Sequence, residues 1–263
     1  MKKYLVIGNP IEHSLSPKLH NYWIKKNKIE AIYDKKKINI DGIEEIINQL
    51  KNNKISGLNV TVPFKNTAIP FLDGLSEVAK KTRSVNTIFK KESKIIGDNT
   101  DVFGFRAAIE KTGINLIEKK VLILGAGGVV PSIISALQNK KISKIIVTNR
   151  TKKKAENLKK MFSNIEIIDW GKQTEFDIVI NATSLGLKKD DKINFNFDGL
   201  EGKFFYDVIY NPKETNFLMN AKKNNMVENG RYMFVYQAAA AFRLWHGIEP
   251  QIDQETMNLL DYD

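Results

Sequence analysis

In the first hundred residues of the chain, short apolar runs alternate with longer segments in which apolar positions recur at helical spacing. The apolar runs predict β-structure at residues 2–7, 31–38 and 56–62 and a hairpin at 85–90 and 94–97. A helix is predicted over 16–28, with Ser16 as N-cap and Pro17 at the first helical position. Another helix is predicted from Asp41, because Glu44 three residues later completes a capping box.

A more regular alternation of strands and helices begins near residue 101. The predicted strands are 119–124, 143–148, 165–168, 176–180 and 204–209. A helix through about residue 139 follows the first of them, and a lysine-rich helix from Thr151 follows the second. Continuously apolar strands that alternate with helices are typical of a parallel sheet covered on both faces. Two helices, 232–246 and 253–260, end the chain.

Composition narrows the class of protein. The chain has 263 residues, which suggests two domains or one large α/β domain, and 42% of them are hydrophobic, enough for a real core. There is no cysteine, which excludes disulfides, thiol nucleophiles and cysteine-ligated metals, and three histidines without a metal-binding pattern predict no metal site. No apolar run approaches the ~20 residues of a membrane span, and the start lacks a signal-peptide core. We therefore expect a cytoplasmic protein without a membrane partner.

The net charge of +11 raises the possibility of a nucleic-acid partner. Lysine accounts for nearly all of the excess, and the lysines are scattered along the whole chain. No nucleic-acid-binding motif is present, and arginine, the better reader of guanine edges, is scarce. A solvated lysine-rich surface is the better interpretation, and no nucleic-acid partner is expected.

A glycine-rich turn, Gly125-Ala126-Gly127-Gly128, lies directly between a predicted strand and a predicted helix. This context is typical of a dinucleotide fingerprint, in which the glycines let the backbone approach a pyrophosphate at the helix N-terminus. Val130 occupies the position of the third glycine of that fingerprint. A simple strand-to-helix bend is the alternative.

The end of the next predicted strand carries Asn149, Arg150 and Thr151, followed by lysines that include Lys154. NAD enzymes place an acidic residue here for the ribose 2′-hydroxyl, whereas arginine can hold a 2′-phosphate bidentately. Thr151 is also the expected N-cap of the following helix. Cations at the start of a helix are unfavourable because of the helix dipole, so their presence here indicates a bound anion. We therefore predict that NADP binds here; an ordinary basic surface is the alternative.

Polar residues also interrupt the first half of the chain. Ser14 and Ser16 suit a polyhydroxylated ligand, although turn and capping chemistry explains Ser16 as well. Alternation along a strand places Asn59 and Thr61 on one face, and Lys65 follows that strand. Asn86 lies within a predicted strand. Asp101 begins a helix, and capping alone would account for it.

These segments together resemble the shikimate dehydrogenase family of NADP-dependent enzymes. The resemblance covers nearly the whole chain and rests on nine segments in order: HSLSP 13–17, NVTVPFK 59–65, VNT 85–87, GDNTD 97–101, GAGG 125–128, NRT 149–151, NATSLG 181–186, Asp207 with Tyr210-Asn211-Pro212, and Tyr236-Gln237-Ala238-Ala239. It implies an NADPH-dependent reduction of 3-dehydroshikimate to shikimate in the chorismate route to aromatic amino acids, with a small-molecule substrate and no metal.

The resemblance also implies roles for single residues. Lys65 and Asp101 match the catalytic pair, which meets the charge that hydride transfer builds on a carbonyl oxygen; either of them can carry the proton. Substrate-binding positions are matched by Ser14, Ser16, Asn59, Thr61, Asn86, Tyr210 and Gln237. Cofactor-binding positions are matched by Gly125, Ala126, Gly127, Gly128, Asn149, Arg150, Thr151, Lys154, Thr183, Ser184 and Gly230. For Thr183 and Ser184 an ordinary polar loop is the alternative.

The implied architecture is α/β, with two domains. Residues 1–101 and 232–263 would form a discontinuous substrate-binding domain, and 102–231 a doubly wound Rossmann domain for NADP, in a monomer or a homodimer. Two departures from the family pattern concern the cofactor. Tyr232 stands where the family often has glycine and can crowd the nicotinamide, and Val129-Val130-Pro131 replaces smaller residues after the glycine turn.

Other functions stay open at this stage. A quinate/shikimate dehydrogenase paralogue of broader specificity would use much of the same substrate half. A non-catalytic NADP-binding regulator would keep the fold without needing Lys65 and Asp101. A basic nucleic-acid binder would show steeply salt-dependent affinity.

Overall fold

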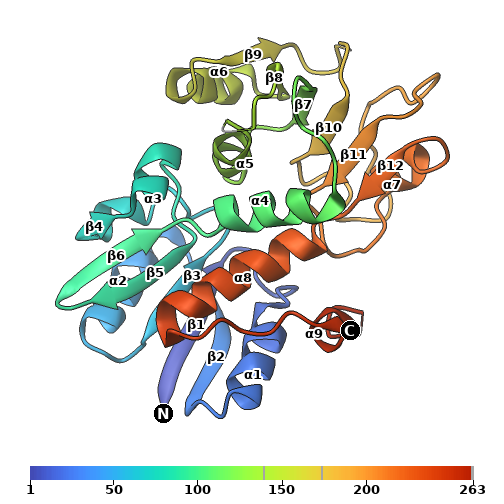
Figure 1. The fold of residues 1–263 in the computed structure, drawn as a ribbon. Helices are drawn as coiled ribbons and strands as arrows, with labels where there is room; N and C mark the ends of the chain where they lie inside the picture. The colour runs from blue at the N-terminus through green and yellow to red at the C-terminus, as the bar shows by residue number, and fades with distance from the viewer. Residues whose placement is uncertain (139, 173, 262–263) are drawn as a thin grey trace. The chain divides into compact units, whose positions relative to one another are not determined.

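The computed structural model describes residues 1–138, 140–172 and 174–261. The chain forms two compact units, one of Met1–Gly104 with Val235–Asp263 and one of Phe105–Phe234. Figure 1 shows the elements of both units. Two predicted ends, residue 139 of the helix after the glycine turn and residues 262–263 of the substrate-binding domain, lie outside the described residues.

The first unit contains a six-stranded mixed sheet in the order β2-β1-β3-β5-β6-β4. Its strands are β1 (Lys2–Gly8), β2 (Ala31–Lys37), β3 (Gly57–Val60), β4 (Gly74–Leu75), β5 (Thr87–Lys91) and β6 (Lys94–Asp98). β1 pairs parallel with β2 and β3, whereas β5 pairs antiparallel with β3 and β6. The helices wholly within this unit are α1 (Ser16–Lys26), η1 (Ile40–Gly42), α2 (Ile43–Lys51), η2 (Ile69–Phe71), α3 (Glu77–Thr82) and α9 (Gln254–Asn258).

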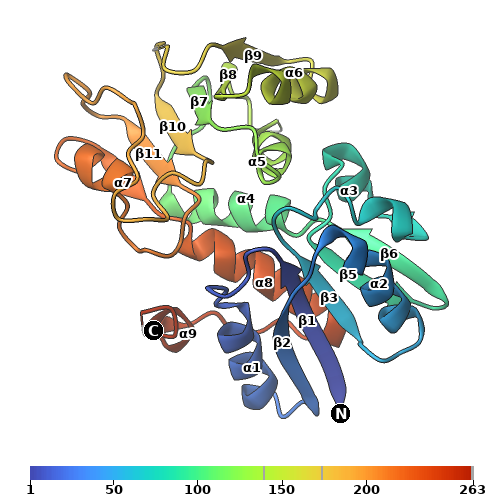
Figure 2. The same ribbon diagram turned by 180° about the vertical axis from the view of Figure 1, so that it is seen from behind.

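Successive side chains of β1 point to opposite faces of this sheet. Leu5 and Ile7 belong to a buried cluster with the apolar stripe of α2, which includes Ile46 and Leu50. Each such side chain contributes roughly 1.5–3 kcal/mol when fully buried. On the other face, Tyr4 contacts Trp245, and aromatic side chains of α1 and of the C-terminal half of α8 (Arg231–His246) pack together. Figure 2 shows α1 beside β2 and α2 near β5.

The second unit is a six-stranded sheet in the order β12-β11-β10-β7-β8-β9, and all of its pairs are parallel. Its strands are β7 (Lys120–Leu124), β8 (Lys144–Thr148), β9 (Ile165–Ile168), β10 (Ile178–Asn181), β11 (Phe204–Asp207) and β12 (Met226–Glu228). Chain order reverses between β7 and β10, and ligands of such sheets bind at the carboxyl ends of strands at this switch point. The predicted doubly wound fold is therefore confirmed.

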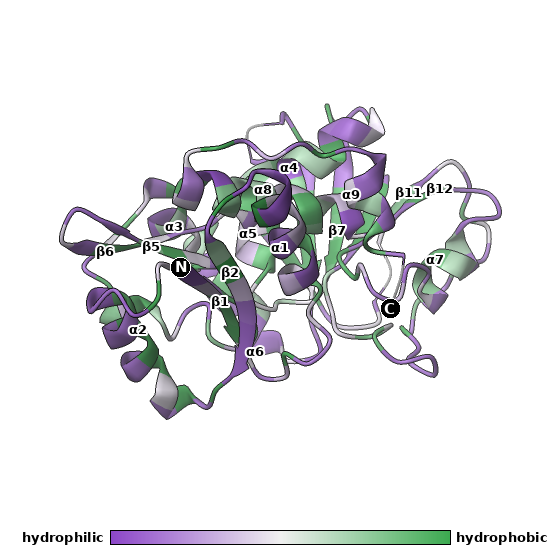
Figure 3. Cartoon of the chain, turned by 90° about the horizontal axis from the view of Figure 1, so that it is seen from below, coloured by the Kyte–Doolittle hydropathy of each residue, from purple (hydrophilic) through white to green (hydrophobic). Residues whose placement is uncertain are grey.

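Both faces of this sheet are covered. One face buries Leu122, Val179 and Phe205 beneath α7 (Asn216–Ala221) and the loop around Phe195. On the other face, Phe105 meets Tyr206 edge to face. α5 (Val130–Leu137) is buried along its whole length, and α6 (Lys152–Met161) lies against β8 and β9. Figure 3 shows β7 as mostly hydrophobic and α2 as a mixture of both characters.

Several predicted boundaries are wrong in detail. The helix at 16 begins at Ser16 itself after Leu15, so Ser16 is not its N-cap. The capping box at Asp41 does not form, because a 3-10 turn over Ile40–Gly42 precedes α2 and no side chain caps that helix. The strand predicted to reach 62 ends at Val60, since Phe64 N donates to Thr61 O and closes a turn. No helix in the described part of the chain is long and apolar enough to cross a membrane.

Candidate active site

A buried ion pair is the main chemical feature of the first unit. The Lys65 Nζ donates to Asp101 Oδ2 at 2.6 Å, and the two side chains are only 11% and 7% exposed. Lys65 follows the turn after β3, and its carbonyl accepts from Val85 N at 2.8 Å. This bond ties the turn to the segment that leads into β5. Asp101 is the first residue of α4 (Asp101–Thr112). Its carboxylate bonds Lys65 and Asn86 side chains, so helix capping does not account for its position.

Asn86 extends this pair into a small cluster. Its Nδ2 lies 2.8 Å from Asp101 Oδ1 and 3.3 Å from Gln237 Oε1, the latter on α8. The Thr100 backbone N–H donates to Asn86 Oδ1 at 2.8 Å, and this fixes which side of the amide faces the carboxylate. The structure thus brings together four residues that the sequence proposes: Lys65, Asn86, Asp101 and Gln237.

The predicted hydroxyls lie at neighbouring strand ends. Ser14 Oγ accepts from Ser16 N at 3.3 Å in a local turn, and Ser16 is buried. Thr61 follows β3 and donates its backbone N–H to Ile7 O of β1. A Cβ at Gly8 would stand 2.5 Å from Thr61 Cγ2, so only glycine permits this approach.

The Asn59 side chain makes three hydrogen bonds with other residues of the protein. Its Nδ2 donates to Asn86 O at 3.0 Å and to Thr87 Oγ1 at 3.1 Å. Its Oδ1 accepts from the Tyr33 hydroxyl at 2.6 Å. Both of its amide hydrogens are therefore used within the protein.

The glycine-rich turn of the second unit lies at the switch point of the parallel sheet. Gly125 has φ +112, and a Cβ there would stand 2.8 Å from Ala182 O in the loop after β10. Only glycine suits both the backbone conformation and the close approach. Gly127 and Gly128 lead into α5, which begins at Val130 with Pro131 in its first turn.

The loop after β8 is linked to this turn. Asn149 Oδ1 accepts from Ala126 N at 3.1 Å, and Asn149 Nδ2 donates to Thr151 O at 2.8 Å. Thr151 is the N-cap residue of α6, as expected, but its side chain makes no capping hydrogen bond. Among the described residues, Arg150 and Lys154 form no ion pair, whereas Lys152 pairs with Asp169 at 3.0 Å. The first turn of α6 contains no acidic residue.

A clamp after β10 and β11 organises the third loop of this region. Asn181 Oδ1 accepts from the N–H and the hydroxyl of Thr183 at 3.1 and 2.7 Å, and Asn181 Nδ2 donates to both oxygens of Asp207. The Thr215 hydroxyl donates to Asp207 Oδ2 at 2.6 Å. Burial raises the pKa of Asp207 to about 6. Ser184 adjoins this clamp in the chain.

The sequence alone did not predict this clamp. Asn181 and Asp207 both fall within the motifs of the family resemblance, yet neither received a role. Polar residues at the last position of otherwise apolar adjacent strands are the signal that could have identified them, because the carboxyl ends of parallel strands meet at one edge.

Gly230, Tyr210 and Tyr232 lie near the end of the second unit. A Cβ at Gly230 would stand 2.1 Å from Val208 O, so no other residue fits there. Tyr210 stacks on Phe234 with ring centroids 4.2 Å apart. The Lys111 Nζ lies 4.5 Å from the Tyr232 ring centroid, so this ring is engaged within its own unit.

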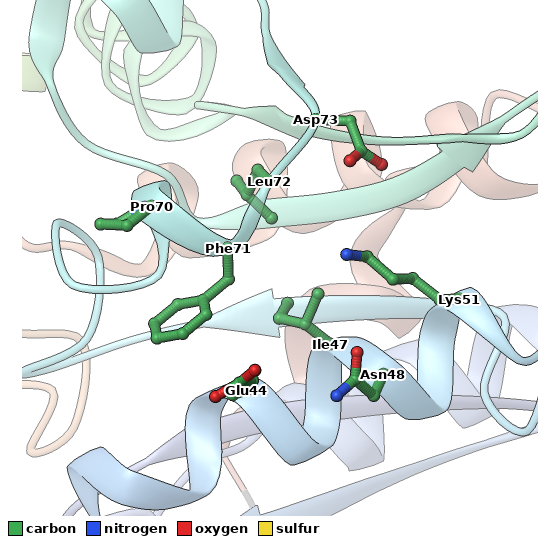
Figure 4. A pocket seen from close by; sticks show the side chains of 8 residues that line it. All are labelled: Glu44, Ile47, Asn48, Lys51, Pro70, Phe71, Leu72 and Asp73. Atoms are coloured by element: carbon green, nitrogen blue, oxygen red, sulfur yellow. The ribbon is translucent and has the colours of Figure 1, made fainter.

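A separate hollow of about 270 Å³ lies between α2 and residues 70–73 in the first unit. Figure 4 shows its lining, with Glu44, Asn48 and Lys51 of α2 on one side and Phe71, Leu72 and Asp73 on the other. None of the predicted site residues lines it. In the described ranges, no group of three or more His, Asp or Glu side chains could hold a metal ion.

Family models match most of the chain. A model described as the shikimate dehydrogenase substrate binding domain matches residues 6–88, one described as shikimate / quinate 5-dehydrogenase matches 106–188, and one described as the shikimate 5'-dehydrogenase C-terminal domain matches 230–254.

Individual relatives match over nearly their whole length. The chain is 60% identical, over 99% of both proteins, to a shikimate dehydrogenase (NADP(+)) of Pelagibacter ubique. Among solved structures, a shikimate dehydrogenase in complex with NADP+ superposes with a TM-score of 0.93 at 34% identity, covering 99% of this chain and 95% of that one. A Thermus thermophilus shikimate 5-dehydrogenase in complex with NADP(H) and shikimate gives 0.88 at 30% identity, covering 99% of each.

Proposed function

The chain belongs to the shikimate dehydrogenase family, and from this premise we propose that it catalyses the reversible NADPH-dependent reduction of 3-dehydroshikimate to shikimate. The observation that carries the proposal is the buried pair of Lys65 Nζ and Asp101 Oδ2 at 2.6 Å. A cofactor-binding regulator has no use for a buried, hydrogen-bonded cation beside a carboxylate. The reaction belongs to aromatic amino acid biosynthesis.

The pair suits reduction of a carbonyl. Hydride delivered to the carbon places negative charge on the oxygen, and a hydrogen-bond donor fixed beforehand lowers the energy of that charge. Lys65 Nζ is held by Asp101 and can donate to this oxygen, and the pair can supply the proton. Asn86 fixes the second oxygen of Asp101 at 2.8 Å, so the carboxylate cannot rotate freely.

Hydrogen-bonding side chains of the first unit support recognition of a polyhydroxylated acid. We assign Ser14 and Ser16 to the substrate carboxylate, Asn59, Thr61, Asn86 and Gln237 to the ring hydroxyls, and Tyr210 to the substrate as well. Hydrogen-bonding partners of this kind discriminate against analogues without a hydroxyl, most strongly where they are buried, as Ser16, Asn59 and Asn86 are, because the protein groups would be left unpaired.

The switch point of the second unit fits a dinucleotide. Gly125, Ala126, Gly127 and Gly128 would lie along the pyrophosphate, with Thr183, Ser184 and Gly230 as further contacts. Arg150 and Lys154, with Asn149 and Thr151, would hold the 2′-phosphate of NADP. NADPH, when bound, supplies the hydride. In this assignment, residues 1–101 and 232–263 bind substrate, and 102–231 bind the cofactor.

We propose further that the enzyme acts in the cytoplasm as a monomer or homodimer, on small molecules only. The decisive experiment follows absorbance at the NADPH band in purified protein with shikimate and NADP+, then with quinate and with NAD+. Turnover of shikimate with NADP+ and a much lower rate with the other pairs is expected. Comparable rates with quinate would favour the paralogue of broader specificity, and no turnover of shikimate would refute the main proposal.

A further inference from the structure

A line of buried neutral side chains runs behind the catalytic pair. It begins at Tyr33 on β2, whose hydroxyl donates to Asn59 Oδ1 on β3 at 2.6 Å. Asn59 Nδ2 donates in turn to Asn86 O, a main-chain carbonyl that can only accept. The orientation of the Asn59 amide is therefore fixed, with its oxygen toward Tyr33 and its hydrogens toward the neighbouring strand.

Thr87 is the next member of the line. Its hydroxyl accepts from Asn59 Nδ2 at 3.1 Å and donates to Asn86 Oδ1 at 3.1 Å. The side chain is fully buried on β5. Because a hydroxyl has a single hydrogen and this one already accepts from Asn59, its hydrogen is directed at Asn86 Oδ1 or at Thr100 Oγ1, 3.2 Å away.

The line ends at the reacting groups. Asn86 Oδ1 also accepts from Thr100 N, so its Nδ2 is directed at Asp101 Oδ1, 2.8 Å away. Asp101 Oδ2 holds Lys65 Nζ at 2.6 Å. Each bond fixes the orientation of the next group, from a tyrosine on the far strand to the lysine.

The ring of Tyr33 is itself held in place. His20 stacks on it with centroids 4.2 Å apart and planes 3° from parallel. Burial lowers the pKa of His20 to about 3, so the stacked imidazole ring carries no charge near neutral pH. The tyrosine hydroxyl thus points at Asn59 from a rigid aromatic cluster.

We propose that Tyr33, Asn59 and Thr87 form a positioning relay that fixes the Asn86 amide and, through it, the Asp101 carboxylate that holds Lys65. This inference rests on the proposed function for the identity of the reaction. Polar side chains in a strand core cost free energy unless all are hydrogen-bonded, and here the bonds converge on the one ion pair that the chemistry needs. Besides the substrate contact proposed above, Asn59 then acts on Asp101 through Asn86.

Two matched substitutions at Thr87 separate hydroxyl from volume. Thr87→Val keeps the branched shape and loses the hydrogen bonds to Asn59, Asn86 and Thr100, whereas Thr87→Ser keeps the hydroxyl. For Thr87→Val we expect kcat per folded enzyme to fall about tenfold with the KM for NADP+ unchanged. For Thr87→Ser we expect kcat to stay close to the wild-type value. Tyr33→Phe, one bond farther away, should lower kcat about threefold.

Thr256→Val is the matched control. Thr256 is also fully buried in the first unit, and its hydroxyl bonds Gln251 O and Asp253, outside the relay. It should lower the melting temperature and leave kcat unchanged. A purely structural role for Thr87 would make Thr87→Val behave like this control.

Crystal structures of Thr87→Val and Thr87→Ser give a readout that does not depend on the reaction. Because Thr100 N still holds Asn86 Oδ1 in both variants, we expect the Asn86 amide to tilt and its bond to Asp101 to lengthen in the valine variant, and to stay in place in the serine variant. An unchanged Asn86–Asp101 bond in the valine variant overturns the relay, whatever the rates. Failure of the wild-type protein to oxidise shikimate overturns the proposed function instead.

Discussion

The side chain of Asn149 joins two loops that follow adjacent parallel strands. Its Oδ1 accepts from Ala126 N in the turn after β7, and its Nδ2 donates to Thr151 O at the start of α6. One amide therefore sets the distance between the proposed pyrophosphate turn and the proposed 2′-phosphate site.

Asn149→Ala should weaken NADP+ binding about tenfold, because the loss of these bonds leaves both loops less ordered before the cofactor arrives. Isothermal titration calorimetry with NADP+ measures the effect, and the KM for shikimate should change little. Asn164→Ala is the control, since Asn164 is exposed, lies outside both loops in the chain and accepts a hydrogen bond from the Gln138 side chain. Equal affinities in the wild type and Asn149→Ala would contradict the proposed linking role.

Arg150→Asp should shift the cofactor preference from NADP+ toward NAD+. An aspartate repels a 2′-phosphate and can accept from a 2′-hydroxyl, so the ratio of kcat/KM values should fall by at least tenfold. Lys159→Asp makes the same charge change in the last turn of α6 and should leave the ratio near that of the wild type. A constant ratio in Arg150→Asp would place the 2′-phosphate elsewhere.

Lys65→Ala should lower kcat by roughly 10²–10⁴, the usual contribution of a positioned acid–base group, with a much smaller change in the affinity for shikimate. The lysine interaction grows as charge develops on the oxygen, so its loss is felt mostly in the transition state. Rates must be expressed per folded enzyme, because the variant leaves the Asp101 carboxylate buried without its cation. Equal losses in kcat and in substrate affinity would indicate a binding role only.

The parallel sheet of the second unit follows closely from the sequence pattern. β7 to β11 are short, mostly apolar runs, and the local pattern is enough to identify them. Strand and helix ends were less predictable, since they depend on bonds to distant residues. The strand predicted to reach 209, for example, ends at Asp207, whose carboxylate accepts from the side chains of Asn181 and Thr215.

The candidate site likewise contains residues that the sequence predicts and residues that only the structure identifies. Motifs in the sequence pointed to Lys65, Asn86, Asp101 and Gln237, and the structure brings their side chains together. Tyr33 and Thr87 gave no such signal, because a buried tyrosine or threonine in a strand is ordinary until its partners on neighbouring strands are known. The roles assigned to single site residues remain predictions for the experiments above.

His20 should make the protein sensitive to mild acid. Neither ring nitrogen has a hydrogen-bond partner in the described part of the chain, and burial, reinforced by His246, lowers the folded-state pKa to about 3 from 6.5. Between these values the unfolded chain binds a proton that the folded protein does not. Stability is therefore full above about pH 6.5 and falls as the pH drops toward 3, by about 2 kcal/mol from this residue between pH 7 and pH 5.

His20→Phe keeps a stacking ring without a titrating group, so urea unfolding at the two pH values should show a smaller loss than in the wild type. His13→Gln, at an exposed position, is the control and should match the wild type. The same loss in His20→Phe as in the wild type would show that other groups cause the acid sensitivity.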